Sequence, residues 1–454
     1  MSAAEMRRVV GARLRAERKL RLWDVPEMAR QLASAAGSGR KTLPAHDTLV
    51  GYVRRWESGR AGISDRFRML YAAAFGIAEE DLFPPAGAAL PEGAAQAEGL
   101  PSGGWARQDN ESLARMLSEQ GISPGNAQRV AHEWLITEPP QVFEVRAGRR
   151  VGAGLAAQLE ARVGWLRTLD DYIGGEDLRE AVLGELTATA ALLGEASYTE
   201  RDGRRLLSVF ADMCQIGGWI ASDAGVHALA ERCYLTGVRA ASAAGDKPMA
   251  ANLLSSLSYQ VANIGDARQA VLLARSACAG AAREATPLMR ALLAERAAWA
   301  NARLPGGQGS AECERALGEA DRAFGEHSSG VQEPPSVYWL DRGEIDVMAG
   351  RCYTELARPL KAQPLLVSVL ARYDDTHARE KALYETWLAE TYVHAREVGE
   401  AARAATRALG LSQRVHSARS RNRIWHVRNQ LLLHAPGDAA VRDFEDRYRA
   451  AEVA

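Results

Sequence analysis

Aromatic residues are scarce in this chain of 454 residues, in which Phe, Trp and Tyr together make up 6%. Strands favour aromatic and β-branched side chains, whereas the abundant alanine favours helix. The composition therefore argues against a sheet protein and predicts an all-α fold. Hydrophobic residues make up 47% and charged residues 25%, which is typical of a globular protein and excludes a wholly disordered chain. A prior of about 150 residues per domain indicates two or three domains.

Long apolar runs are missing as well. No run in the sequence approaches the roughly 20 residues that a membrane-spanning helix needs. Residues 1–8 carry charges with no apolar stretch behind them, so we expect no secretory signal peptide. We therefore expect no membrane partner and a cytoplasmic location, associated with the nucleoid if the chain binds DNA.

Residues for metal binding or catalysis are few and scattered. The five cysteines are odd in number and form no Cys-x-x-Cys, which fits buried thiols in a reducing compartment better than disulfides or a metal site. The sequence contains no His-Glu-x-x-His, no Gly-x-Ser-x-Gly and no Gly-Lys-[Ser/Thr]. We therefore expect no enzyme activity, no metal and no cofactor. The cysteines are Cys214, Cys233, Cys278, Cys313 and Cys352.

The net charge of −1 conceals an asymmetry. Residues 1–85 hold 15 Lys and Arg against 10 Asp and Glu, while the remainder holds 41 against 47. The N-terminal segment, called the head below, is thus basic, and the remainder, called the body, is acidic. A basic head fits a polyanionic partner such as nucleic acid. Surface arginines are common in any protein, so the residue pattern within the head must decide.

Apolar periodicity predicts four helices in the head. The second helix starts at Asp24-Val25-Pro26-Glu27, where the Asp caps the first turn and Glu27 completes a capping box. The third helix buries a stripe formed by Leu49, Val53 and Trp56 at i, i+4 and i+7. The predicted ranges are Glu5–Leu20, Asp24 to the Gly37-Ser38-Gly39 stretch, about Ala45–Ser58, and Asp65–Phe75.

The stretch from Leu14 to Phe83 resembles the DNA-binding domain of the Xre family, the lambda-repressor-like helix-turn-helix regulators. The segments that carry the resemblance are Val53-Arg54-Arg55-Trp56-Glu57-Ser58-Gly59-Arg60 and Leu70-Tyr71-Ala72-Ala73-Ala74-Phe75-Gly76-Ile77. The resemblance implies that the second and third helices form the reading unit, with the third in the major groove. Two features depart from the family: Val25 stands where the family often has Gln, and residues 37–44 make a long turn.

The exposed side of the third helix supplies the predicted DNA contacts. Arginine bound to guanine is the commonest specific contact, so we assign Arg54 and Arg55 to base edges or phosphates. Arg40 and Arg60 suit phosphate better than base. The alternative is that these arginines are ordinary solvated helix surface. The predicted DNA-binding residues are Arg40, Lys41, His46, Asp47, Val50, Gly51, Arg54, Arg55 and Arg60.

Two segments separate the head from the rest of the chain. Residues 84–104 contain four Pro, five Gly and six Ala without periodicity, which indicates a flexible linker or a domain boundary. Residues 105–200 are predicted to form a helical connecting region, with breaks at Pro124, Pro139-Pro140 and Gly174-Gly175. No repeat is found there.

A repeat begins after residue 200. Small or apolar residues spaced x, x+4, x+7 recur at intervals of 40, 46, 46 and 39 residues. This pattern resembles the tetratricopeptide repeat, whose helix pairs stack into a superhelix with a concave groove. The alternative is a helical bundle without repeats. The recurring triplets are Ala230/Tyr234/Gly237, Ala270/Ala274/Ala277, Ala316/Ala320/Ala323, Ala362/Leu366/Val369 and Ala401/Ala405/Ala408.

The groove that this resemblance implies is lined by the first helix of each pair. Asparagine suits such a groove because its amide both donates and accepts hydrogen bonds. A polar outer surface is the alternative for the same residues, and Trp299 and Trp387 are interpreted as core. The predicted ligand- or peptide-binding residues are Asp212, Gln215, Trp219, Asn252, Ser255, Tyr259, Asn263, Glu344, Arg351, Glu390 and His394.

The whole arrangement resembles Xre-family regulators with C-terminal tetratricopeptide-like repeats, of the actinobacterial type. The resemblance implies a transcriptional regulator that binds double-stranded DNA as a homodimer and responds to a signalling peptide or small molecule. The alternative function is a scaffold or signalling adaptor that does not bind DNA. The predicted domains are a head at 1–83, a linker at 84–104, a connecting region at 105–200 and a sensor or oligomerisation domain at 201–454.

Overall fold

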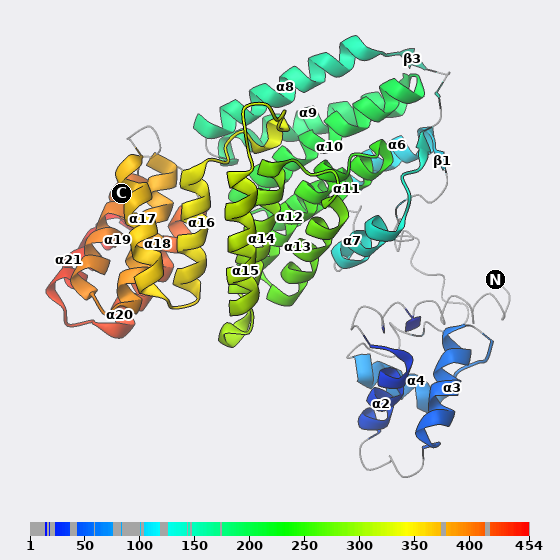
Figure 1. Ribbon diagram of the computed structural model, residues 1–454, viewed down its shortest axis with the longest axis horizontal. Coiled ribbons are helices and arrows are strands. Elements are labelled where there is room, and N and C mark those ends of the chain that lie inside the picture. Colours follow the sequence, from blue (N-terminus) through cyan, green and yellow to red (C-terminus); the bar gives the residue numbers. More distant parts are fainter. Residues whose placement is uncertain are drawn as a thin grey trace. The chain divides into compact units, whose positions relative to one another are not determined.

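The computed structural model is predominantly helical, which confirms the helical fold class (Figure 1). Contacts divide the chain into two units, residues Met1–Ala97 and Glu98–Ala454. No helix among the described residues is long and apolar enough to cross a membrane. The structure describes residues 14–15, 18, 23–36, 43–58, 60–75, 83, 100, 104–118, 126–142, 144–145, 148–172, 175–373, 378–413 and 418–453.

Among the described residues of the first unit, helices α2 (Val25–Ala35), α3 (His46–Glu57) and α4 (Asp65–Phe75) lie close to the predicted ranges. The predicted Asp24 cap is confirmed, because its side chain accepts a 2.6 Å hydrogen bond from the backbone N–H of Glu27. The predicted capping box is not formed, because the Glu27 carboxylate instead accepts hydrogen bonds from Arg30 and Gln31. Of the predicted helix Glu5–Leu20 only Leu14, Arg15 and Arg18 are described, and these three are helical. The core of the unit consists of Leu14, Met28, Ala29, Leu32, Leu49, Val53, Trp56, Tyr71, Phe75 and Phe83.

The second unit starts with a region that contains short strands as well as helices. Strand β1 (Gly104–Trp105) pairs in parallel with β2 (Gln141–Val142), and β3 (Arg149–Arg150) pairs in parallel with β4 (Ala196–Ser197). The expectation of a purely helical connecting region is therefore wrong in this detail. Two-residue strands leave no alternating pattern in a sequence, because distant chain segments bring them together. The helices of this region are α6 (Arg107–Leu117), α7 (Asn126–Ile136), α8 (Ala153–Tyr172) and α9 (Gly175–Glu195).

A buried tryptophan and a close backbone approach at a glycine hold these short strands in place. Trp105 is fully buried, and its indole N–H donates a 2.8 Å hydrogen bond to Oδ1 of Asn110. Gly148 has a φ of +123°, and a Cβ on it would lie 2.1 Å from the Glu195 carbonyl oxygen. Only glycine fits that approach, so Gly148 lets β3 lie beside β4.

In the part of the chain that the structure describes, twelve α-helices follow in six consecutive pairs. Within each pair the two helices pack together, and the first helices also pack against one another in series, from α10 through α12, α14, α16 and α18 to α20. The first helices are α10 (Glu200–Asp223), α12 (Lys247–Ile264), α14 (Pro287–Ala302), α16 (Arg342–Glu355), α18 (Ala378–His394) and α20 (Ala418–His434). The second helices are α11 (His227–Ala244), α13 (Ala267–Ala281), α15 (Ser310–Gly325), α17 (Pro359–Arg372), α19 (Val398–Ser412) and α21 (Ala439–Val453).

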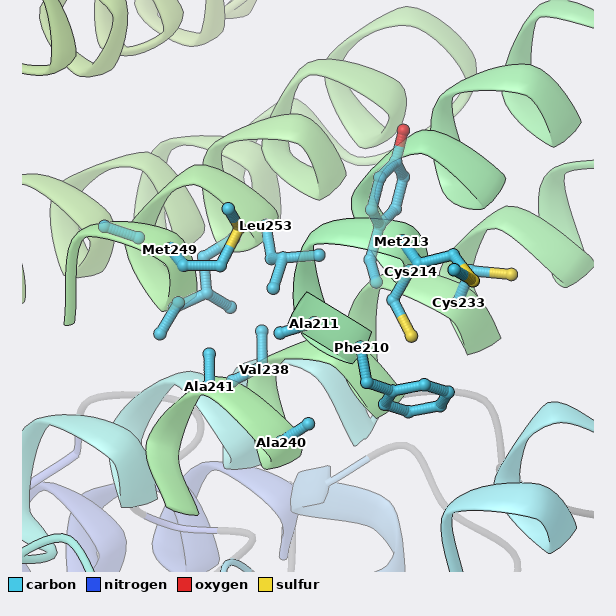
Figure 2. Close-up of a cluster of buried hydrophobic side chains, with 14 of the residues drawn as sticks. Phe210, Ala211, Met213, Cys214, Cys233, Val238, Ala240, Ala241, Met249 and Leu253 are labelled. Atoms are coloured by element: carbon cyan, nitrogen blue, oxygen red, sulfur yellow. The ribbon is translucent and has the colours of Figure 1, made fainter. Parts of the chain in front are cut away.

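The recurring triplets lie on the second helices α11, α13, α15, α17 and α19, and all of their residues are buried. Figure 2 shows the packing around the first of these helices, where Cys214 of α10, Val238 of α11 and Leu253 of α12 meet. The described cysteines are free thiols. Small residues at these positions let the helices approach closely, which is what the spacing predicted.

Replacing Gly237 by alanine is expected to destabilise the second unit by about 1–3 kcal/mol, because the added methyl overfills a packed core. The new Cβ would lie 2.7 Å from a Leu253 methyl carbon and 2.8 Å from the Cys214 Cβ. Denaturant unfolding measures the effect. The control is Gly184→Ala on α9, where a Cβ meets nothing within 4 Å, and helix propensity predicts a gain of up to about 1 kcal/mol. Equal stability of Gly237→Ala and the parent chain would contradict this packing.

Candidate functional site

Helix α3 of the first unit has one buried face and one exposed face. Leu49, Val53 and Trp56 are buried in the core as predicted. On the other side His46, Asp47, Arg54 and Arg55 are exposed, and Val50 and Gly51 are half-buried. A Cβ on Gly51 would meet nothing within 4 Å, so a flat surface could approach the backbone closely there.

The buried end of α3 is fixed to its surroundings by polar contacts. The Trp56 indole donates to the Gly62 carbonyl at 3.1 Å. The Glu57 carboxylate, 4% exposed, accepts two hydrogen bonds from the Arg18 guanidinium, at 2.6 Å and 2.7 Å. Glu57 raises the pKa of Arg18 through this hydrogen bond, although burial acts in the opposite direction. A bidentate pair of this kind joins the first predicted helix to α3 and sets the direction of the exposed face.

The two arginines of this face differ in how they are held. Arg55 lies over the Tyr52 ring, with its guanidinium carbon 4.9 Å from the ring centroid. The side chain of Arg54 makes no hydrogen bond or ion pair with another described residue and extends into solvent. Arg60 is exposed beyond the helix. The predicted contacts Arg40 and Lys41 lie outside the described residues.

The second unit contains a cavity of about 560 Å³, which is within the usual size for small-molecule sites. It lies between α10, α12, α14, α16, α18 and α20, and so it is bounded by the first helices of the six pairs. Six of the predicted ligand-binding residues line it, namely Trp219, Tyr259, Asn263, Arg351, Glu390 and His394.

The other five predicted ligand residues do not line the cavity. It lies at the C-terminal ends of α10, α12, α14 and α16, whereas these five residues are nearer the middle or the start of their helices. Asp212 forms an ion pair with Arg167 of α8, and Glu344 accepts hydrogen bonds from the hydroxyls of Tyr373 and Tyr384. The Ser255 hydroxyl donates to the Asn252 carbonyl, Asn252 is buried, and Gln215 is half-buried. The predicted residues lie on α10, α12, α16 and α18 but not on α14 or α20, and the repeat spacing could not tell which end of each helix encloses the cavity.

Aromatic rings form a continuous series along one side of the cavity. The ring centroids of Trp219 and Tyr259 are 6.0 Å apart, those of Tyr259 and Trp299 are 6.3 Å apart, and those of Trp299 and Trp387 are 5.4 Å apart. Trp299 and Trp387, interpreted from the sequence as core, are buried and also line the cavity.

Arginine side chains lie against these rings. The guanidinium of Arg351 is 4.5 Å from the Trp299 centroid, and that of Arg423 is 3.5 Å from the Trp387 centroid. Arg419 lies 5.4 Å from the Trp219 centroid. Cation–π contacts hold each guanidinium in a fixed plane, so its N–H groups are directed before any ligand arrives.

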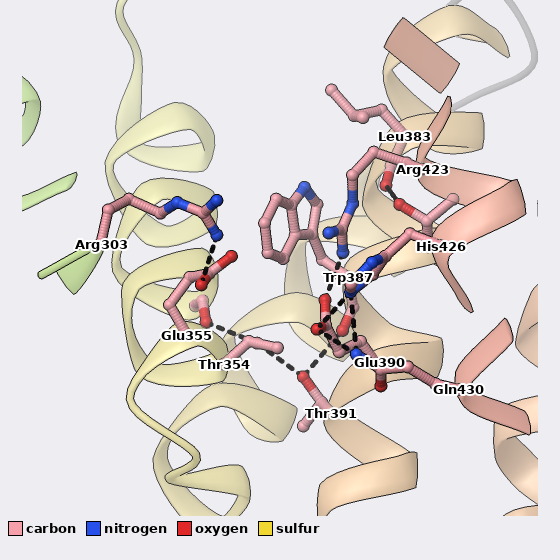
Figure 3. Close-up of polar contacts among 12 residues, drawn as sticks. Arg303, Thr354, Glu355, Leu383, Trp387, Glu390, Thr391, Arg423, His426 and Gln430 are labelled. Atoms are coloured by element: carbon pink, nitrogen blue, oxygen red, sulfur yellow. Dashed lines mark hydrogen bonds and ion pairs between the residues drawn. The ribbon is translucent and has the colours of Figure 1, made fainter. Parts of the chain in front are cut away.

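Ion pairs connect the lining residues across the cavity. Arg303 pairs with Glu355 at 2.6 Å. Glu390 accepts from Arg423 and, at 3.0 Å, from the Gln430 amide, and its carboxylate lies 3.1 Å from His426 (Figure 3). Burial alone raises the pKa of Glu390, but Arg423 and His426 outweigh it and lower that pKa well below its usual value.

Two further ion pairs connect helices that are far apart in the sequence. Arg419 of α20 lies 3.4 Å from the Asp223 carboxylate of α10. Arg379, at the start of α18, lies 3.8 Å from the Asp170 carboxylate of α8. Helices far apart in the sequence therefore enclose the cavity together, and a ligand inside it would contact both ends of the series.

The cavity holds a positive potential that acts on Tyr259. Burial raises the pKa of this phenol, but Arg351, Arg419 and Arg296 outweigh burial and lower the pKa to about 8. Burial raises the pKa of Tyr234 and Tyr384, so these phenols do not titrate in the same range.

We therefore expect one tyrosine of the folded chain to ionise near pH 8. Ultraviolet difference absorbance of tyrosinate should show this step, and Tyr259→Phe should remove it. Because the folded pKa lies below the ordinary value of 10, the phenolate stabilises the fold only as the pH rises above about 8, and fully only above pH 10. Below pH 8 the contribution is lost. An unchanged titration between pH 7 and 9 in Tyr259→Phe would contradict the positive potential.

Sequence reasoning missed several lining residues, among them Asp223, Arg303, Arg419 and Arg423. A signal was present, because first helices repeatedly carry two lining residues four positions apart near their C-terminal ends. Trp219 with Asp223, Trp299 with Arg303, and Arg351 with Glu355 follow this spacing.

No protein-family model matches the chain, and no curated protein and no solved structure matches it. Function must therefore be argued from the residues and geometry of the chain itself.

Proposed function

We propose that the chain is a non-enzymatic, sequence-specific DNA-binding transcriptional regulator, with an Xre-type helix-turn-helix head and a tetratricopeptide-like body. The observation that carries the proposal is the exposed face of α3. That face offers Arg54 and Arg55 on a helix whose opposite side is fixed in a core. A helix fits the major groove of DNA, and arginine reads guanine there.

The body supplies the regulatory part of the proposal. Its cavity is enclosed by helices from both ends of the series, so a peptide or small molecule bound there can favour one shape of the body over another. A homodimer would then present two heads to two half-sites about 34–36 Å apart only when the body holds them at that spacing.

Salt dependence tests the DNA-binding role. With about six phosphate contacts, affinity for duplex DNA should fall on the order of 1,000-fold between 50 and 200 mM salt, because bound cations are released from the DNA. Fluorescence anisotropy of a labelled duplex with the full chain measures this. A weak affinity that does not change with salt would reject the proposal.

One observation favours a second candidate, a scaffold or adaptor that binds no DNA. Val25, the first residue of α2, packs against the core of the first unit and offers no polar group at the position where the family often has Gln. An adaptor would show no DNA affinity at any salt concentration, so the same titration separates the two candidates.

A further inference from the structure

The ion pairs of the cavity leave one arginine without an acidic partner. Among the residues that the structure describes, four arginines line the cavity and three carboxylates face them. Glu355 pairs with Arg303, Asp223 with Arg419, and Glu390 with Arg423. The fourth arginine, Arg351, forms no ion pair with another described residue. The lining therefore carries an excess positive charge at Arg351.

Aromatic rings hold Arg351 in place, and no described carboxylate lies within ion-pair distance of it; the buried Glu295 carboxylate acts on it only at longer range. The residue is 6% exposed, and one guanidinium nitrogen donates a 2.7 Å hydrogen bond to the Tyr259 hydroxyl. Its Nε is buried and has no hydrogen-bond partner among the described residues. Its guanidinium lies 4.5 Å from the centroid of Trp299 and 5.1 Å from that of Trp387. Burying a charge without an ion-pair partner is costly, so an anion bound to this guanidinium would offset part of that cost.

The aromatic lining indicates the shape of the rest of the ligand. One continuous series of rings lines the cavity, formed by Trp219, Tyr259, Trp299 and Trp387. Trp425, which is 55% exposed, adds a further ring to the lining. Flat rings stack well on such surfaces. Asn263 and Gln260 also line the cavity and can bind polar ring atoms.

We propose that this cavity binds a small planar anion, a carboxylate or phosphate joined to an aromatic ring, with Arg351 binding the anionic group and the tryptophans contacting the ring. A guanidinium donates two parallel hydrogen bonds to either anion. The volume of about 560 Å³ suits a small molecule. This ligand class would be the signal that the repeat region senses, and that regulatory role rests on the proposed function.

Ligand panels on the full-length chain test the inference without DNA. The carboxylate arm compares 2-naphthoate with neutral 2-naphthamide and with cyclohexanecarboxylate, which is not planar. The phosphate arm compares 2-naphthyl phosphate with neutral 2-naphthol. Quenching of tryptophan fluorescence and the shift in thermal unfolding both report binding. At least one planar anion should bind, and its neutral and non-planar analogues should bind at least about tenfold more weakly. The neutral analogues lose the charge-assisted hydrogen bonds, and the non-planar one loses the contacts of a flat ring with the tryptophans.

Variants locate the bound anion. Arg351→Gln should weaken binding of that anion by at least about tenfold, because the charge and the forked donors are both removed. Arg351→Lys keeps the charge and loses the fork, so it should bind with intermediate affinity, and it covers the case in which Arg351→Gln fails to fold. Arg315→Gln, on the exposed surface of α15, should bind like the parent chain.

Three results would overturn the inference: no planar anion of either arm binds, the neutral analogues bind equally well, or both Arg351 variants bind like the parent chain. None of these results depends on DNA binding. Failure of the salt titration would reject the regulator and leave the ligand class in place, so the two failures are distinguishable.

Discussion

Replacing Arg54 and Arg55 together by alanine is expected to remove most of the sequence preference of the chain for DNA. Both side chains are exposed on α3, opposite its buried stripe. Each good contact between an arginine and a guanine contributes about 1–3 kcal/mol of discrimination against the wrong base. Competition between an enriched duplex and its mutated form measures the loss. Non-specific affinity should fall far less, because other cationic residues still meet phosphates.

The matched control is Arg315→Ala, which removes an exposed arginine from α15 in the other unit. It should leave the sequence preference unchanged. If the double variant discriminates between duplexes as well as the parent chain does, the two arginines do not read bases, and the assignment of α3 as the reading helix is wrong.

Glu57→Gln is expected to destabilise the first unit by about 3–5 kcal/mol, because it leaves the Arg18 charge buried without its partner. The pair is nearly inaccessible to water, with side-chain exposures of 9% for Arg18 and 4% for Glu57. Hydrogen exchange of the α3 amides reports the stability of this unit separately from the larger one. DNA affinity should fall in parallel, since the unit would no longer hold α3.

A double replacement of Arg18 and Glu57 by methionine provides the control. Removing both charges leaves no unpaired ion, so the double variant should be much more stable than Glu57→Gln. A loss below about 1 kcal/mol in Glu57→Gln, the range of exposed ion pairs, would show that this pair does not hold α3 in place.

Local sequence rules predicted the parts of the fold that local interactions determine. The Asp24 cap, the buried stripe through Trp56 and the small residues such as Gly237 follow from spacing alone, and the structure confirms each of them. The short parallel strands could not be predicted in this way. Gly104 pairs with Gln141 and Arg149 with Ala196 only because tertiary packing brings these segments together.

Local sequence patterns also predicted only part of the cavity. The predicted residues lie on four of the six helices that line it, α10, α12, α16 and α18, and Tyr259 and Arg351 are among them. The spacing could not show that α20 closes against α10, because the contact between Arg419 and Asp223 joins residues from opposite ends of the series. The charge balance that singles out Arg351 depends on that closure.

Selection of bound fragments from a pool of random duplex DNA, with the full-length chain at near-physiological salt, tests the central claim most directly. The account predicts an enriched motif with two half-sites whose centres lie about 34–36 Å apart. It also predicts that the Arg54→Ala, Arg55→Ala variant fails to enrich the motif. A pool in which neither protein enriches any sequence, or in which both enrich the same motif, would contradict DNA reading by α3.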